Sequence, residues 1–239
     1  MNTLKACNYQ ECYKRQIFQG IKFIEKGDVD FPTYFEENEV FMSLGNNQES
    51  NIAFIGKSFP NDEDRVIIST YSSEACLNGY TITLRSFFGS DYFAIKGANQ
   101  AGGRVRVLLD MGLSVAIKKY RYILSSILIN DGQILSPFEP DELKSNLTMK
   151  LCDSLISHIP LLVFFSFTKR EYELAVKALD LGGDIVIHRN ALKYKGARRL
   201  VAEGAPVTDS FTDLLEKCGK TPKGYLYWDK DNNPLFFKV

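Results

Sequence analysis

Gly97 and Gly102 are separated by four residues and followed by Gly103 and Arg104, a spacing that resembles a phosphate-binding loop. Such a loop needs Gly-x-x-x-x-Gly-Lys-Ser/Thr between a strand and a helix, because backbone amides, the lysine and the helix N-terminus must all meet the phosphate. Here glycine stands at the lysine position and arginine at the hydroxyl position, and the next residues alternate like a strand. The stretch predicts a glycine-rich connection rather than a nucleotide site.

A second stretch carries the other half of the same motif, Gly56-Lys57-Ser58, with Asn51 in place of the first glycine. The incomplete motif again predicts no nucleotide site.

Asp91 and Lys96 could belong to a metal-dependent nuclease, in which carboxylates bind the cation and a lysine steadies the attacking water. The acid of that motif stands two residues before the lysine, where this chain has Ala94. The alternative of a metal-dependent phosphodiesterase stays open, but enzymatic activity is not favoured. Cys152 and His158 are separated by about 240° on a helix, so they predict no nucleophile pair. We expect no metal and no cofactor.

Two clusters of basic residues are the main sign of function. The first has one acid, Asp110, between residues 96 and 121, and the second has none between 185 and 202. If residues 104–109 form a strand, the arginines of the first cluster share one face and form a solvent-facing ladder. The expected nucleic-acid-binding residues are Lys96, Arg104, Arg106, Lys119, Arg121, Arg189, Lys193, Lys195, Arg198 and Arg199.

These clusters suit the binding of a polyanion, and three nearby tyrosines, Tyr120, Tyr122 and Tyr194, could stack on bases. The leading hypothesis is a non-enzymatic accessory protein that binds nucleic acid. The alternative partner is a protein, bound through aromatic residues of the C-terminal segment such as Trp228 and Phe236.

The 239 residues include 29 basic and 29 acidic side chains, so no global field attracts polyanions and any attraction is local. The N-terminal residues are too polar for a secretory signal, and no apolar run approaches the roughly 20 residues of a membrane-spanning helix. Five scattered cysteines without a CxxC pair favour reduced thiols in the cytoplasm.

The expected fold is α+β. A helix ending at Gly27 precedes a mainly antiparallel β-rich half, with strands expected in "EVFMSL", "NIAFIG", "RVIISTY", "GYTITLRSF", "DYFAIK", "RVRVLLD", "LSVAIKKY" and "RYILSSILI". An α/β half follows, with a helix from Pro140 to Pro160, a buried strand "LLVFFSF", a helix after Thr168, a strand "DIVIH", helices after Asn190 and Ser210, and a C-terminal hairpin. The change in composition near residues 136–141 suggests domains at 1–138 and 139–239, or one continuous domain.

Overall fold

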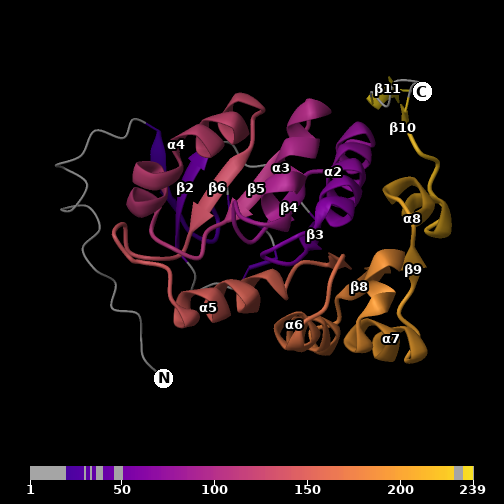
Figure 1. Ribbon diagram of the computed structural model, residues 1–239. Coiled ribbons are helices and arrows are strands. Elements are labelled where there is room, and N and C mark those ends of the chain that lie inside the picture. Colours follow the sequence, from indigo (N-terminus) through magenta and orange to yellow (C-terminus); the bar gives the residue numbers. More distant parts are fainter. Residues whose placement is uncertain are drawn as a thin grey trace.

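The computed structural model describes residues 20–29, 31–32, 34–35, 40–45, 51–228 and 234–238. Within them one nine-stranded sheet forms the centre, in the order β1-β2-β6-β5-β4-β3-β7-β8-β9 (Figure 1). Strand β2 is antiparallel to β1 and β6, and the other pairs are parallel. The strands are β1 (Ile21–Ile24), β2 (Phe41–Gly45), β3 (Ile52–Ile55), β4 (Ile82–Leu84), β5 (Val105–Leu108), β6 (Gln133–Ser136), β7 (Leu161–Phe164), β8 (Asp184–His188) and β9 (Val207–Thr208).

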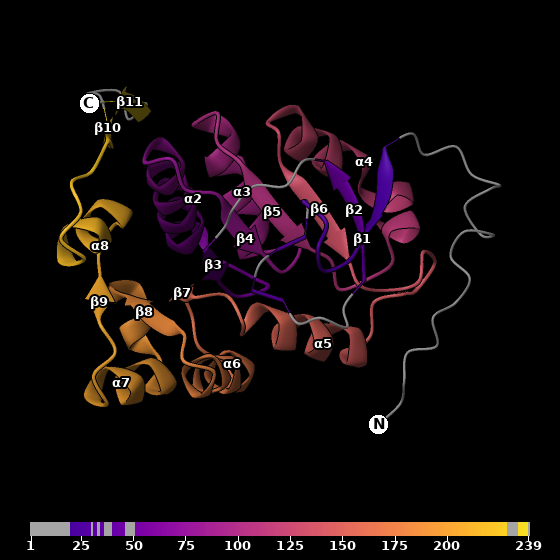
Figure 2. The ribbon, with the colours of Figure 1, turned by 180° about the vertical axis from the view of Figure 1, so that it is seen from behind.

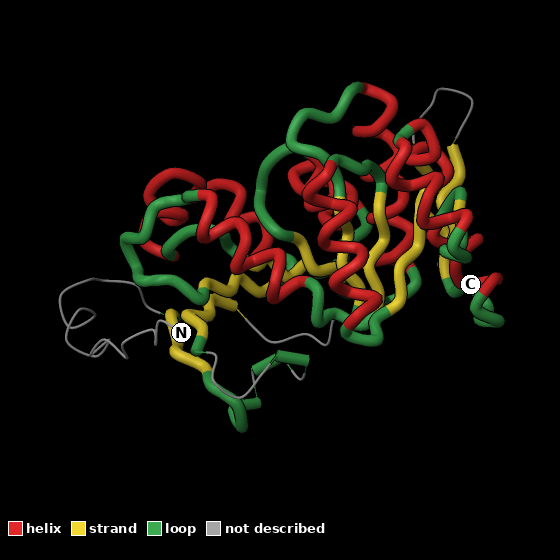
Figure 3. Tube along the Cα trace, turned by 90° about the horizontal axis from the view of Figure 1, so that it is seen from below, coloured by secondary structure: helices red, strands yellow, loops and turns green. Residues whose placement is uncertain are grey.

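Helices cover both faces of this sheet, as the two opposite views and the tube seen from below show (Figures 2 and 3). One face carries α2 (Asp62–Leu77), α3 (Ser90–Gln100), α4 (Leu113–Ile129) and α8 (Phe211–Lys217). The other carries α5 (Asn146–Ile156), α6 (Lys169–Asp180) and α7 (Lys195–Ala202), the last preceded by a 3₁₀ turn, Arg189–Lys193. In β3, Phe54 packs in the first core and Ile55 in the second, so the strand is buried on both sides.

The prediction that helices and strands are combined is confirmed, but the prediction of a mainly antiparallel first half is wrong. The segments "RVIISTY", "DYFAIK", "LSVAIKKY" and "RYILSSILI" lie in α2, α3 and α4, so the connections between β3, β4, β5 and β6 are helical and the strands parallel. In α3 the buried side chains Ala94, Ile95 and Ala98 follow the helical period. Their aromatic and β-branched neighbours imitate a strand over so short a window.

Several local predictions are confirmed. Thr168 caps α6 through a capping box with Glu171, and Ser210 caps α8. The predicted start of a helix near Pro140 is wrong: α5 begins after Ser145, because Ser145 accepts the hydrogen bond of the Thr148 N–H. The C-terminal hairpin consists of β10 (Gly224–Trp228) and β11 (Pro234–Lys238).

The first predicted helix falls largely on residues 1–19, outside the described part of the chain, and residues 21–24 form β1 instead of its last turn. The division into domains at 1–138 and 139–239 stays a prediction, although β3 and β7, from the two parts, pair in one sheet. Within the described residues, no helix has the length and apolar character needed to cross a membrane.

The edge of the sheet at β9 is short and partly occupied. Its two residues pair with the end of β8, and the Lys217 ammonium of α8 donates a hydrogen bond of 2.7 Å to the Val207 carbonyl.

Candidate functional site

A small crevice lies at the carboxyl ends of the central strands. Strands β4, β5 and β6 lie on one side of β3, and β7, β8 and β9 lie on the other. The order in which the chain adds strands to the sheet therefore reverses between β3 and β7, although the two strands are parallel. Ligands of open α/β sheets bind outside the carboxyl ends of the strands at such a reversal. The crevice has a volume of about 50 Å³ and is lined by Gly56, Lys57, Ser58, Arg85, Ser86, Phe88, Asp91, Asp110, Lys144 and Arg170.

Gly56 and Gly89 allow two loops to approach closely at this crevice. A Cβ atom on Gly56 would lie 2.3 Å from the Cβ of Ser90, and one on Gly89, whose φ is +57°, would lie 2.6 Å from the Lys57 carbonyl oxygen. The Ser90 N–H donates a hydrogen bond of 3.0 Å to that same carbonyl. The loop after β3 is therefore held directly against the start of α3.

Arg85 lines the crevice and connects several elements around it. Its guanidinium is buried and donates to the Gly56 carbonyl at 3.0 Å, to Asp153 at 3.1 Å and to Glu171 at 3.2 Å. Burial alone would raise the pKa of Glu171, but Arg85 and the hydrogen bonds from Thr168 hold that pKa below its usual value. Strands β3 and β4 and helices α5 and α6 are thus joined through one cation.

Two carboxylates, Asp91 and Asp110, also face the crevice. Burial raises the pKa of Asp91 to about 7, a shift that Arg85 opposes and Asp110 reinforces. Lys144 lies 2.6 Å from one carboxylate oxygen of Asp110, while the other oxygen is buried without a hydrogen-bond partner. This oxygen of Asp110 can therefore accept a hydrogen bond from a ligand.

Lys57 and Arg170 complete the basic lining. Lys57 pairs with Asp64 near the start of α2, and this contact raises the pKa of Lys57 despite the opposing effect of burial. Arg170 pairs with Asp153, so that carboxylate is shared between Arg170 and Arg85. With Arg85 and Lys144, four basic side chains line the crevice, each paired with a carboxylate, so an anionic ligand would compete with those carboxylates for the cations.

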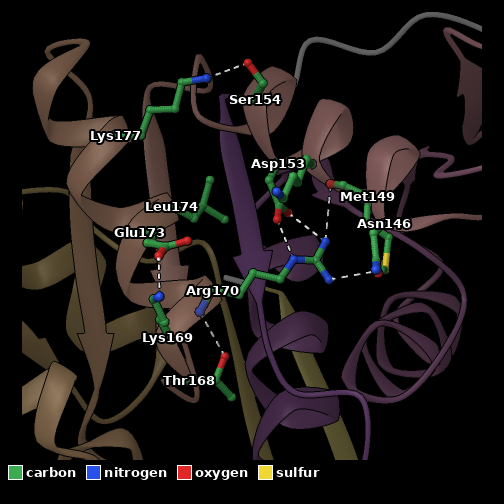
Figure 4. Close-up of a pocket in the computed structure, with 11 residues that line it drawn as sticks. Asn146, Met149, Asp153, Ser154, Thr168, Lys169, Arg170, Glu173, Leu174 and Lys177 are labelled. Carbon is green, nitrogen blue, oxygen red and sulfur yellow. Dashed lines mark hydrogen bonds and ion pairs between the residues drawn. The ribbon is translucent and has the colours of Figure 1, made fainter.

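A larger groove of about 760 Å³ lies between α5 and α6, next to the crevice (Figure 4). Arg170 lines both cavities and reaches from α6 toward Asp153 and Met149 of α5. Farther along, Lys177 points toward Ser154, and Glu173 pairs with Lys169.

The structure separates the members of the first predicted basic cluster. Arg106 is only 1% exposed and donates to Gln133 at 2.8 Å and to the Tyr34 hydroxyl, so the solvent-facing ladder expected with Arg104 does not exist. The expectation failed because β5 is a central parallel strand covered on both faces. The exposed members are Lys96 on α3, Arg104 before β5, and Lys119 and Arg121 on α4.

The second predicted cluster is exposed, and most of its charges have close partners. Arg189 pairs with Asp209, Lys193 with Asp64 and Arg199 with Glu203. Arg198 donates to the Leu192 and Lys193 carbonyls, and Lys195 is exposed at the start of α7. Helices α4 and α7 lie on opposite faces, toward opposite ends of the sheet, so the two clusters do not form one surface (Figure 1).

Asp91 and Lys96, proposed together for a nuclease, face different cavities. Asp91 lines the crevice, whereas Lys96 lines a groove between α3 and α4 with Tyr92 and Ile123. Within the described residues no three potential metal ligands come together. The side chains of Trp228 and Phe236, named for a protein partner, lie outside the described part of the chain.

The sequence prediction missed the crevice itself. Its available signal was Gly56-Lys57-Ser58, set between a buried strand and a helix capped by Asn61. The sequence prediction rejects this stretch as a phosphate site because Asn51 stands where the full P-loop motif has its first glycine. Arg85 gave no local signal, because its partners Asp153 and Glu171 are 68 and 86 residues away.

No protein-family model matches the chain, and no curated protein is significantly similar to it in sequence. Several solved structures are similar to this chain in fold. DNA processing protein A (DprA) from Streptococcus pneumoniae is 19% identical, with a TM-score of 0.71 over 84% of this chain and 75% of that one. The chain has the same fold. DprA from Helicobacter pylori is 16% identical, with a TM-score of 0.67 over 84% of this chain and 96% of that one.

A molybdenum cofactor binding protein from Rippkaea orientalis is more distant. It is 12% identical, with a TM-score of 0.52 over 70% of this chain and 94% of that chain. These likenesses establish a doubly wound α/β fold, and function has to be argued from the crevice.

Proposed function

We propose that this protein binds single-stranded nucleic acid, with one phosphate group held in the crevice at the carboxyl ends of β3, β4 and β5. The observation that carries the proposal is a phosphate-sized crevice at the carboxyl ends of the central strands, lined by four basic side chains and by a loop in which Gly56 packs directly against Ser90. The volume of about 50 Å³ suits one phosphate-sized group and is too small for a base.

The comparisons support the nature of the ligand. The H. pylori structure was determined for its mode of binding single-stranded DNA, and it covers 84% of this chain. Lys57 and Lys144 line the crevice with partly exposed side chains, and lysine commonly neutralises phosphate charge.

The proposal is tested with a fluorescein-labelled oligothymidylate of 12 nucleotides, by anisotropy at increasing salt. We expect binding that weakens steeply with salt, and a loss of at least tenfold in affinity in Lys57→Glu and Lys144→Glu. Lys223→Glu is the matched control, because Lys223 is exposed beyond the far end of α2 and the variant carries the same charge change. Undetectable binding by the wild-type protein, or equal losses in the control, would overturn the proposal.

The basic clusters predicted from the sequence remain a separate proposal for an auxiliary binding surface. The exposed pair Arg198 and Arg199 is suitable for its test by charge reversal, and a loss smaller than that of Lys57→Glu is expected because these side chains lie outside the crevice. The non-enzymatic accessory role and the cytoplasmic location stay predictions.

A further inference from the structure

The groove between α5 and α6 is larger than the crevice and open to solvent, and the phosphate site described above leaves it unused. Its volume is about 760 Å³ against about 50 Å³ for the crevice. Arg170 belongs to the lining of both cavities, and its side chain extends toward Asp153 and Met149 of α5 (Figure 4). A chain-like ligand with one group in the crevice therefore meets the groove next.

The charges of the groove favour an anionic chain. Four basic side chains line it, Lys150, Lys169, Arg170 and Lys177, against the two acids Asp153 and Glu173. Both acids are already neutralised, since Asp153 pairs with two arginines and Glu173 pairs with Lys169 at 3.7 Å.

Two lysines of the groove remain available for phosphates. Lys150 projects from α5 and is exposed, and Lys177 of α6 is exposed with a neutral partner, the Ser154 hydroxyl. They lie on the two walls of the groove, whose lining also includes the apolar side chains Met149 and Leu174. The arrangement offers cations at the rim and apolar surface within, which suits a strand with phosphates outward and bases inward.

We infer that the groove between α5 and α6 is a second nucleic-acid subsite, which receives the nucleotides next to the phosphate held in the crevice. The inference rests on the proposed function and deepens it, because it assigns a place to the nucleotides beyond the one phosphate held in the crevice. No aromatic side chain is among the lining residues, so base stacking contributes little there and the affinity comes mainly from phosphate contacts.

The test compares oligothymidylates of 2 and 12 nucleotides on the wild-type protein and on Lys150→Glu/Lys177→Glu. For the longer probe we expect a loss of at least tenfold in affinity and a log–log salt slope that is smaller by about 1.4, since each single-strand phosphate contact contributes about 0.7. Affinity for the dinucleotide should change less than twofold, because the crevice is intact. Circular dichroism checks that the variant is folded.

Two controls make the result specific. Lys220→Glu/Lys223→Glu carries the same change of charge beyond the far end of α2 and should bind both probes like the wild-type protein. Lys150→Arg/Lys177→Arg keeps the charges and should retain at least half of the affinity for the longer probe.

The outcomes separate the two proposals. If the wild-type protein binds neither probe, the crevice proposal and the groove inference both fail. If it binds both probes and the groove variant binds the longer one as tightly as the wild-type protein, only the groove inference fails. If poly-glutamate displaces the longer probe as effectively as unlabelled oligothymidylate, the groove is a site for acidic protein and the inference is overturned.

Discussion

Arg85 donates a hydrogen bond of 3.0 Å to the backbone carbonyl of Gly56, so a cation buried at the end of β4 holds the loop that follows β3. The same guanidinium pairs with two carboxylates, Asp153 of α5 and Glu171 of α6, whose helices cover one face of the sheet. The shape of the crevice and the stability of the fold therefore depend on one residue.

Replacement of Arg85 by methionine should cost about 3–5 kcal/mol in the free energy of unfolding, since it leaves Glu171 and part of Asp153 buried without their cation. Urea denaturation followed by circular dichroism measures the loss. The double variant Arg85→Met/Glu171→Gln should lose less than the sum of the single changes, because the two side chains interact directly. Strict additivity would contradict the role given to this pair.

Gly56→Ala should destabilise the protein by about 1–3 kcal/mol, because the new Cβ would lie 2.3 Å from the Cβ of Ser90 and the start of α3 must shift. It should also weaken oligonucleotide binding, since the loop after β3 moves with it. The matched control is Gly196→Ala in α7, where the nearest atom is the Cδ2 of Tyr172 at 3.3 Å. That variant should be unchanged or up to about 1 kcal/mol more stable. Equal stability of the two variants would argue against the close approach.

Asp91 should make stability depend on pH. Its pKa is about 7 in the folded protein against a usual value of 3.8, so between these pH values the folded state binds more protons than the unfolded chain. Its contribution to the free energy of unfolding therefore falls as pH rises from about 4 to about 7. Asp91→Asn stays uncharged and should be more stable than the wild-type protein at pH 8, with a smaller difference at pH 5. Urea titrations at both pH values decide, and an identical difference at the two would refute the prediction.

Arg106→Glu should unfold the protein or cost several kcal/mol, because it buries an uncompensated carboxylate beside Gln133. Arg104→Glu, two residues earlier and exposed, should change the free energy of unfolding by about 0.5 kcal/mol or less. Thermal melts of the two variants provide the comparison. Comparable melting temperatures would mean that Arg106 is accessible after all.

Local sequence signals predicted the second half of the fold better than the first. The Thr168 and Glu171 capping box fixes the start of α6 through contacts between residues two and three positions apart, so it is visible without the rest of the chain. The direction of β5 depends instead on which strands lie beside it, and nothing within "RVRVLLD" encodes β4 and β6 as neighbours. Alternation therefore placed Arg106 on an exposed face that the fold does not have.

For the crevice, the sequence identified some of the charged residues but not their arrangement in space. Both Lys57 and Asp91 attracted attention in the sequence, each through a motif that is incomplete. Their meeting in one crevice depends on the parallel pairing of β3 and β4, whose carboxyl ends lie at the same edge of the sheet. Arg170 pairs with Asp153, 17 residues away, and no local pattern in the sequence links the two residues.

The short edge at β9 has a consequence for how the protein associates with copies of itself. A long exposed edge strand offers free backbone groups on which another chain can add a strand, the first step of many aggregates. Here the edge spans two residues, and the ammonium of Lys217 already occupies the Val207 carbonyl. A second chain that approached this edge would have to displace that lysine for at most two residues of pairing. The protein is thereby protected at this border against growth into extended sheets.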